Sequence, residues 1–167
     1  MIEFDDKRWW HGVTRWISST TLGAKALSSI LHRLDKFTIQ RSNGRYSLSN
    51  LLGGTPIVTL TTIGAKSGRP RTMPLIGIPD GDNVILIASN WGGEKNPAWY
   101  YNLRANPEVT LMYKGKSATY LAGEVRDEER DRCWAKAVDL YPGYAGYTAR
   151  AGDRQIPVIV LKPQTET

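Results

Sequence analysis

Short apolar segments that alternate with turn residues make up the second two-thirds of the chain. Six of these segments are rich in β-branched and aromatic residues and are bounded by turn formers, so each is predicted to be a strand. Pro74 would restrict its strand to an edge or a bulge, and Asp80-Gly81 predicts a tight hairpin turn. The predicted strands cover residues 57–63, 71–78, 84–89, 108–113, 117–125 and 156–161, with a further short strand at 37–41.

Apolar residues at three- and four-residue steps predict helices elsewhere. The longest covers residues 7–36, with a break at the Ser/Thr cluster 18–21, which favours a new N-cap. A second helix is expected to start with Asn96 as N-cap and Pro97 in its first turn, and to end near residues 104–107. The third covers residues 127–140 and has an acidic first turn.

This arrangement favours a mainly β fold. Six or seven strands with few long helices between them argue against an alternating βαβ sheet and for an antiparallel barrel with packed helices. We expect an N-terminal helical extension at residues 1–36 and one barrel domain at residues 37–167.

Composition limits the chemistry further. The chain has 167 residues, of which 41% are hydrophobic and 23% charged, as in an ordinary globular domain. One cysteine, Cys133, excludes an intrachain disulfide, and with two histidines beside it no metal site is expected. No apolar run is long enough to cross a membrane, and the acidic start does not read as a secretory signal, so we expect a cytoplasmic protein.

Positive charge is concentrated near the N-terminus. The net charge is +6, and residues 7–45 hold eight basic residues against one acidic residue. An anionic lipid surface or a polyanionic small molecule fits this better than nucleic acid, because no nucleic-acid motif accompanies it. The first helix also carries Trp9, Trp10 and Trp16, which suit either peripheral contact with a membrane or packing against the barrel or another subunit.

The densest set of unusual residues lies in segment 61–71, TTIGAKSGRPR, between two predicted strands. Its glycines allow a tight turn and close approach of a ligand, and free N–H groups in such a turn can bind an anion. The segment is interpreted either as a loop that binds phosphate or carboxylate, or as a solvated hairpin tip. Its cations are Lys66, Arg69 and Arg71.

Common catalytic motifs are absent from the sequence, including the G-x-S-x-G elbow, the P-loop and H-E-x-x-H. Cys133 lies within a predicted helix beside Trp134 and is expected to be packed. A bound cofactor is therefore the natural carrier of any chemistry.

Four sequence blocks together resemble the deazaflavin-dependent nitroreductase family of actinobacteria, split β-barrel proteins related to FMN-binding barrels. The blocks are residues 60–71, then 88–89 with 94–100 and 102–107, then 141–144 with 147, and 156–158. The resemblance implies coenzyme F420, an 8-hydroxy-5-deazaflavin, and transfer of hydride from its C5 to a quinone-like, nitro or other conjugated acceptor. A non-catalytic coenzyme-binding or storage protein and an FMN-dependent barrel oxidase remain alternatives, and the oligomeric state is open.

The resemblance also implies a set of site residues. Around the phosphate of the coenzyme tail it places Lys66, Ser67, Arg69, Arg71 and Lys95. Along the deazaflavin it places Ala88, Ser89, Asn90, Asn96, Pro97, Ala98 and Trp99. On the acceptor side, as catalytic residues, it places Tyr141, Tyr144 and Tyr147 together with Ser89.

Alternatives and departures accompany these assignments. Trp99 also suits a core position, and the tyrosines also suit a packed, rigid loop. Ile76 stands where nitroimidazole-reducing members are expected to carry tyrosine, which favours quinone-like acceptors. Asn90 stands where some members have lysine, which would remove one cation from the tail site.

Overall fold

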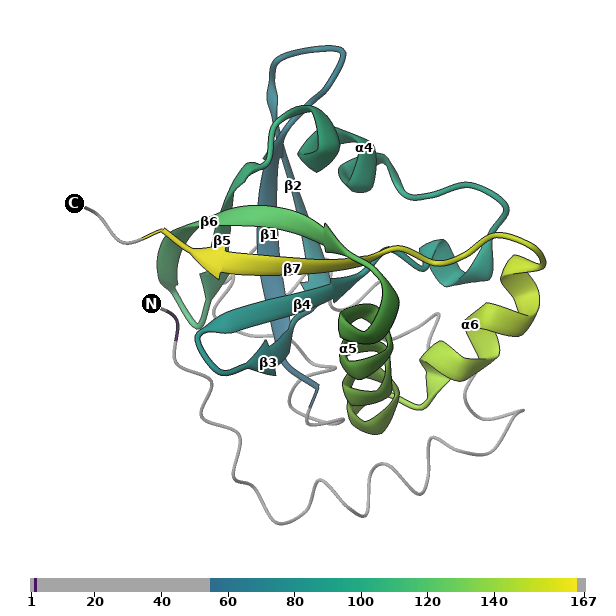
Figure 1. Cartoon of the computed structure of the whole chain (residues 1–167). Helices are drawn as coiled ribbons and strands as arrows, with labels where there is room; N and C mark the ends of the chain where they lie inside the picture. The colour runs from purple at the N-terminus through teal and green to yellow at the C-terminus, as the bar shows by residue number, and fades with distance from the viewer. Residues whose placement is uncertain (1, 3–54, 165–167) are drawn as a thin grey trace, which may run out of the picture.

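The computed structural model describes residue 2 and residues 55–164, and within them one seven-stranded antiparallel sheet dominates (Figure 1). The strand order across the sheet is β2-β1-β5-β6-β7-β4-β3. The strands are β1 (Ile57–Ile63), β2 (Pro70–Ile76), β3 (Ile78–Asp80), β4 (Asn83–Ile87), β5 (Glu108–Tyr113), β6 (Lys116–Val125) and β7 (Val158–Pro163). The expected mainly β split barrel is confirmed.

A single glycine lets this sheet curl into a half-barrel. β2 and β3 are consecutive in the chain yet lie at opposite edges of the sheet, and Gly77 alone separates them. The Gly77 N–H donates to the Pro56 carbonyl at 2.9 Å. A Cβ at this position would lie 2.6 Å from a methyl carbon of Val58 and 3.2 Å from one of Val84, so a larger residue would push β1 and β4 apart.

Two apolar clusters lie on the two faces of the curled sheet. The interior cluster is built on β1, β4, β5 and β7 and includes Leu60, Leu86, Leu111 and Trp99. The exterior cluster lies on β3, β4 and β7 and includes Ile85, Val160, Cys133 and three tyrosines. Alternation along the strands sends successive residues to the two faces, as Val84 and Leu86 face inward while Ile85 and Ile87 face outward.

Three α-helices and one 3₁₀ turn complete the described part. They are η1 (Asn90–Gly92), α4 (Ala98–Ala105), α5 (Asp127–Leu140) and α6 (Gly143–Ala151). α4 packs on β1, while α5 packs on β3, β4 and β7 and contacts α6, which in turn contacts η1 (Figure 1). None of the helices within the described residues is long and apolar enough to cross a bilayer.

Several predicted elements match the structure residue for residue. The strands at 57–63 and 108–113 and the helix at 127–140 have the expected bounds, and β2, with Pro74, lies at an edge of the sheet. Cys133 is packed in the exterior cluster as expected. The predicted helices of residues 7–36, the strand at 37–41 and the domain boundary at residue 36 fall outside the described residues.

Five predictions of local structure were wrong. The single strand expected at 71–78 is divided at Gly77, because the chain there crosses from one sheet edge to the other. β4 ends at Ile87, so Ala88 and Ser89 leave the sheet. The N-cap of α4 is Pro97 rather than Asn96. The expected loop through the tyrosines is largely helix α6, and the last strand starts at Val158.

Asp80 joins the β3–β4 hairpin to α5. Its carboxylate accepts hydrogen bonds from Arg132 at 2.9 and 2.8 Å and from Lys136 at 2.8 Å, and its side chain is 12% exposed. Arg132 and Lys136 are four residues apart on α5 and so lie on one face. The hydrogen bonds from Arg132, opposed by burial and aided by Lys136, lower the pKa of Asp80 from 3.8 to about 2.

We predict that Asp80→Asn lowers the free energy of unfolding at pH 7 by roughly 1–2 kcal/mol, less than the full pKa shift implies because the two cations are about half exposed. A depressed carboxylate pKa contributes stability above the unfolded pKa near 4 and loses it as the pH falls towards 2. Urea denaturation of both proteins between about pH 2.5 and pH 7 measures the difference, which should shrink below about pH 4. Asp82→Asn, on the same turn, is the control; a difference that stays constant into acid would exclude the ion pairs as its cause.

Candidate functional site

The β1–β2 loop forms a compact basic tip. The Gly64 N–H donates to the Arg69 carbonyl at 2.9 Å, and the Gly68 N–H donates to the Gly64 carbonyl at 2.8 Å. Gly68 has a φ of +62°, which favours glycine, and the Ser67 hydroxyl accepts the Arg69 N–H at 3.3 Å. These backbone bonds close the loop on itself. The cations of the tip, Lys66, Arg69 and Arg71, are all exposed.

Two asparagines of α4 hold this tip in place. Asn102 accepts the Ala65 N–H at 3.0 Å and donates to the Thr62 hydroxyl at 3.1 Å. Asn106, the C-cap of α4, donates to the Ile63 carbonyl at 3.5 Å. The base of the hairpin is therefore braced on the helix, and Figure 1 shows the β1–β2 loop extending beyond α4 from this base.

The N-terminal end of α4 lies at the opposite end of the helix from Asn106, which braces the basic tip. Pro97 is the N-cap, and no side chain caps the first turn. The helix therefore presents N–H groups and its positive dipole end where the chain arrives from Lys95 and Asn96. Ala98 is exposed at this end, whereas Trp99 is only 3% exposed and lies in the interior core.

The segment after β4 is an irregular turn. Ala88 and Ser89 are buried, and the Ala88 N–H donates to the Pro157 carbonyl at 3.0 Å. Asn90 and Trp91 have φ values of +47° and +58°, a conformation that side chains other than glycine rarely adopt. The Asn90 side chain donates to the Lys95 carbonyl at 2.9 Å, which closes residues 90–95 into a loop.

The side chain of Arg154 forms hydrogen bonds with both ends of this turn. Its guanidinium donates to the carbonyls of Gly93 at 2.9 Å, Ser89 at 2.7 Å and Ala88 at 3.4 Å, and to the side-chain oxygen of Asn96. Sequence reasoning missed this residue. The available signal was a single arginine between a helix and a strand, and its partners are backbone oxygens, which carry no sequence signature.

The rings of the three tyrosines, Tyr141, Tyr144 and Tyr147, contact one another near the junction of α5 and α6. Tyr144 and Tyr147 are 4% and 7% exposed, and their rings meet edge to face with centroids 5.8 Å apart. The hydroxyls of Tyr141 and Tyr147 share a hydrogen bond of 3.3 Å. Burial raises the pKa of Tyr144, and burial together with the bond to Tyr141 raises the pKa of Tyr147, so both hydroxyls keep their protons at neutral pH.

The structure brings the tyrosine cluster to the turn after β4. The Trp91 ring meets the Tyr147 ring with centroids 6.0 Å apart, and Arg150 lies 4.7 Å from the centroid of Tyr147. A Cβ on Gly92 would lie 2.7 Å from the Tyr147 carbonyl oxygen, so η1 and α6 are in close contact. The turn after β4 thus meets the tyrosine cluster through Trp91 and Gly92, whereas the basic tip is braced on α4.

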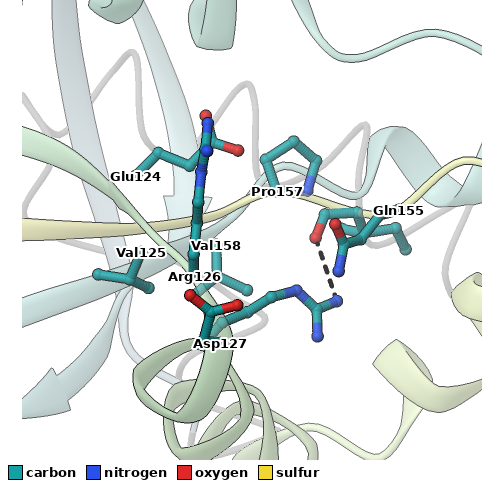
Figure 2. A pocket seen from close by; sticks show the side chains of 9 residues that line it. Glu124, Val125, Arg126, Asp127, Gln155, Pro157 and Val158 are labelled. Atoms are coloured by element: carbon teal, nitrogen blue, oxygen red, sulfur yellow. Dashed lines mark hydrogen bonds between the residues drawn. The ribbon is translucent and has the colours of Figure 1, made fainter.

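A separate polar cavity of about 250 Å³ lies where β6 ends and α5 begins (Figure 2). Arg130 is one of its lining residues and donates to the Ile156 carbonyl at 3.5 Å. The polar and charged lining residues are Glu124, Arg126, Asp127, Arg130 and Gln155. None of the site residues predicted from the sequence lines this cavity.

Comparison with known proteins agrees with this geometry. The family model described as F420H(2)-dependent quinone reductase matches residues 31–163. A Mycobacterium tuberculosis protein named F420H(2)-dependent quinone reductase is 33% identical over 152 residues, which are 89% of this chain and 97% of that protein.

Solved structures give the same result. A structure described as an F420-H2 dependent reductase has 41% identity and a TM-score of 0.60 over 64% of this chain and 94% of that one. Another, described as a domain-swapped dimer, has 34% identity and a TM-score of 0.62 over 82% of this chain and 99% of that one. With a curved antiparallel sheet, a braced basic loop and a matching model over most of its length, this chain belongs to the F420H(2)-dependent quinone reductase family.

Proposed function

We propose that this protein is an oxidoreductase that uses reduced coenzyme F420 to reduce a quinone-type acceptor. The observation that carries the proposal is the basic tip, in which three exposed cations are crowded on a loop that α4 holds in place. Like charges held close together favour a bound anion. The matched family supplies the identity of the anionic ligand.

The residues present fit that coenzyme. Arg69 and Arg71 suit bidentate contact with phosphate or carboxylate groups of a tail, and Lys66 adds a point charge. Ser89 and the first N–H groups of α4 offer neutral donors, as expected along a heterocycle with carbonyl and ring-nitrogen acceptors. When bound, the reduced coenzyme supplies a hydride; the protein's part is to hold it and the acceptor at the right distance.

The tyrosine cluster is assigned to the acceptor side. Tyr141 is partly exposed, while Tyr147 lies behind it and shares its hydrogen bond. A neutral hydroxyl can donate to the acceptor oxygen on which negative charge develops during reduction. In this assignment Tyr141 faces the acceptor, and Tyr147 and Tyr144 orient it. Quinone-like acceptors are favoured over nitroimidazoles because position 76 is isoleucine.

The N-terminal residues suit a supporting role. Tryptophans and cations share the segment 7–16, so we propose that it promotes contact with an anionic membrane surface, where apolar quinones partition. A cytoplasmic location is part of this proposal.

Removing a cation from the tip is the first test. We predict that Lys66→Ala or Arg71→Ala weakens binding of coenzyme F420 by roughly ten- to hundred-fold, because each loses a charge-assisted contact. Titration of the coenzyme's fluorescence measures the affinity. Lys116→Ala, at the start of β6, is a matched control with an exposed cation elsewhere. If Lys66→Ala and Arg71→Ala both bind as the wild type does, the anion site lies elsewhere.

The second test removes a hydroxyl from the tyrosine cluster. We predict that Tyr147→Phe lowers the single-turnover rate with menadione by about ten-fold or more, while coenzyme affinity changes little. Anaerobic bleaching of the reduced coenzyme gives the rate. Tyr101→Phe, which removes an exposed hydroxyl from α4, serves as the control. Absence of any bleaching in the wild type would support the storage alternative, and tight retention of FMN would support the oxidase alternative.

The third test uses pH. Because the pKa of Tyr147 is raised, its hydroxyl stays protonated above the ordinary tyrosine range, and we expect its contribution to persist in base. The ratio of the wild-type rate to the Tyr147→Phe rate should therefore be constant between about pH 7 and pH 10. Using the ratio cancels titration of coenzyme and acceptor. A ratio that falls to one near pH 10 would show that the hydroxyl ionises as an exposed tyrosine does.

A further inference from the structure

The turn of residues 89–93 has a shape that its own sequence does not favour. Three successive residues, Asn90, Trp91 and Gly92, have positive φ values of 47°, 58° and 78°. Of these, glycine alone adopts such a conformation freely, and a bulky indole-bearing residue is strained there. The turn has two internal backbone bonds, from Gly92 N–H to the Ser89 carbonyl and from Gly93 N–H to the Asn90 carbonyl. A left-handed run of this kind persists where surrounding contacts hold it.

Arg154 supplies those contacts from outside the turn. Its Nε donates to the Gly93 carbonyl and its Nη2 to the Ser89 carbonyl, at 2.9 and 2.7 Å. Its Nη1 donates to the Ala88 carbonyl at 3.4 Å and to the Asn96 side-chain oxygen. One planar group thus links both ends of segment 88–96. A lysine in its place has a single nitrogen and cannot reproduce the fork.

Arg154 is itself held in place by the backbone between α6 and β7. Its N–H donates to the Ala151 carbonyl at the end of α6 at 3.1 Å. Three residues later Pro157 directly precedes β7, and its carbonyl accepts the Ala88 N–H. The guanidinium therefore joins two segments that are each tied to regular structure. Because the Arg154 side chain links the α6–β7 connection to segment 88–96, the shape of segment 88–96 depends on it.

We propose that Arg154 is a positioning residue that holds segment 88–96 in the conformation that binds the coenzyme. This inference rests on the proposed function, because its consequence is the placement of Ser89, Asn90 and Lys95 along the ligand. It also explains why Asn96 is not the N-cap of α4: its side-chain oxygen is engaged by Arg154 instead. The same fork sets the direction in which the chain enters α4.

Arg130 provides a matched control. It is also a partly buried arginine, and it donates to the Ile156 carbonyl in the segment next to Arg154. Its side-chain hydrogen bonds go to Asp131 and to the Ile156 carbonyl, and not to residues 88–96. Arg130→Ala therefore removes a similar side chain from the same neighbourhood and leaves the fork intact.

The test compares Arg154→Lys, Arg154→Ala and Arg130→Ala with the wild type. Without coenzyme, hydrogen exchange of peptides that cover residues 88–97 should be at least about ten-fold faster in both Arg154 variants, while peptides from β1 and β5 exchange as before. Affinity for coenzyme F420 should fall by at least about ten-fold in both. Millimolar guanidinium ion should restore part of the affinity of Arg154→Ala and none of that of Arg154→Lys, whose side chain fills the position. If Arg154→Ala does not fold, the lysine variant carries the exchange and affinity measurements.

Each outcome discriminates. Unchanged exchange and affinity in the Arg154 variants, or equal losses in Arg130→Ala, would overturn the proposal. Faster exchange with unchanged affinity would make Arg154 a structural residue and also overturn it. If the wild type itself fails to bind coenzyme F420, the proposed function falls and this role falls with it, whereas wild-type binding with loss only in the Arg154 variants supports both.

Discussion

The close approach of β1 and β4 at Gly77 is the constraint on which the rest of this fold depends. A residue with a Cβ would meet Val58 and Val84 there, so glycine is what allows the chain to pass from one sheet edge to the other. The sheet must then curl, and curling gives it a concave face filled by large apolar side chains and a convex face on β3, β4 and β7. The convex face is where α5 and α6 pack, and α6 brings the tyrosine cluster to η1. The location of the tyrosine cluster thus follows from how the sheet closes.

The site itself consists of irregular backbone held by side chains. Buried or constrained backbone groups outside regular structure need hydrogen-bond partners, and in this protein amides and one guanidinium provide them. Asn102 and Asn106 form hydrogen bonds with backbone groups at the base of the basic tip. Asn90 and Arg154 do the same in the turn after β4. Side chains that bond to the backbone in this way fix a loop without making it a helix or strand, which leaves its remaining N–H groups and cations available to a ligand.

Features that depend on interactions between neighbours in the sequence were predicted from it, whereas features that depend on tertiary contacts were missed. β1, β5 and α5 were predicted residue for residue, because apolar periodicity and end signals are local. The division of the 71–78 segment was missed, since Gly77 is required by contacts with Val58 on β1 and Val84 on β4, which the segment's own apolar pattern does not indicate. The basic tip stood out through its own glycines and cations, whereas Arg154 acts on carbonyl oxygens that every residue has. The tyrosines were expected in a loop because Pro142, Gly143 and Gly146 are poor helix formers, yet packing of Tyr144 and Tyr147 on the outer core stabilises α6 over that preference.

Burial of the tyrosines bears on what kind of catalysis this site can perform. The raised pKa values of Tyr144 and Tyr147 keep these two hydroxyls neutral, so in the proposed function they are suited to donate hydrogen bonds rather than to act as bases. Hydride transfer needs donor and acceptor carbons aligned within a few tenths of an ångström of a productive distance, and a shift of about 1 Å can cost about a hundred-fold in rate. A protein that contributes geometry more than acid–base chemistry is therefore most sensitive at the contacts that fix its loops. In this chain those contacts are concentrated at Arg154 and Asn102, neither of which is among the cations or hydroxyls assigned to the ligand itself.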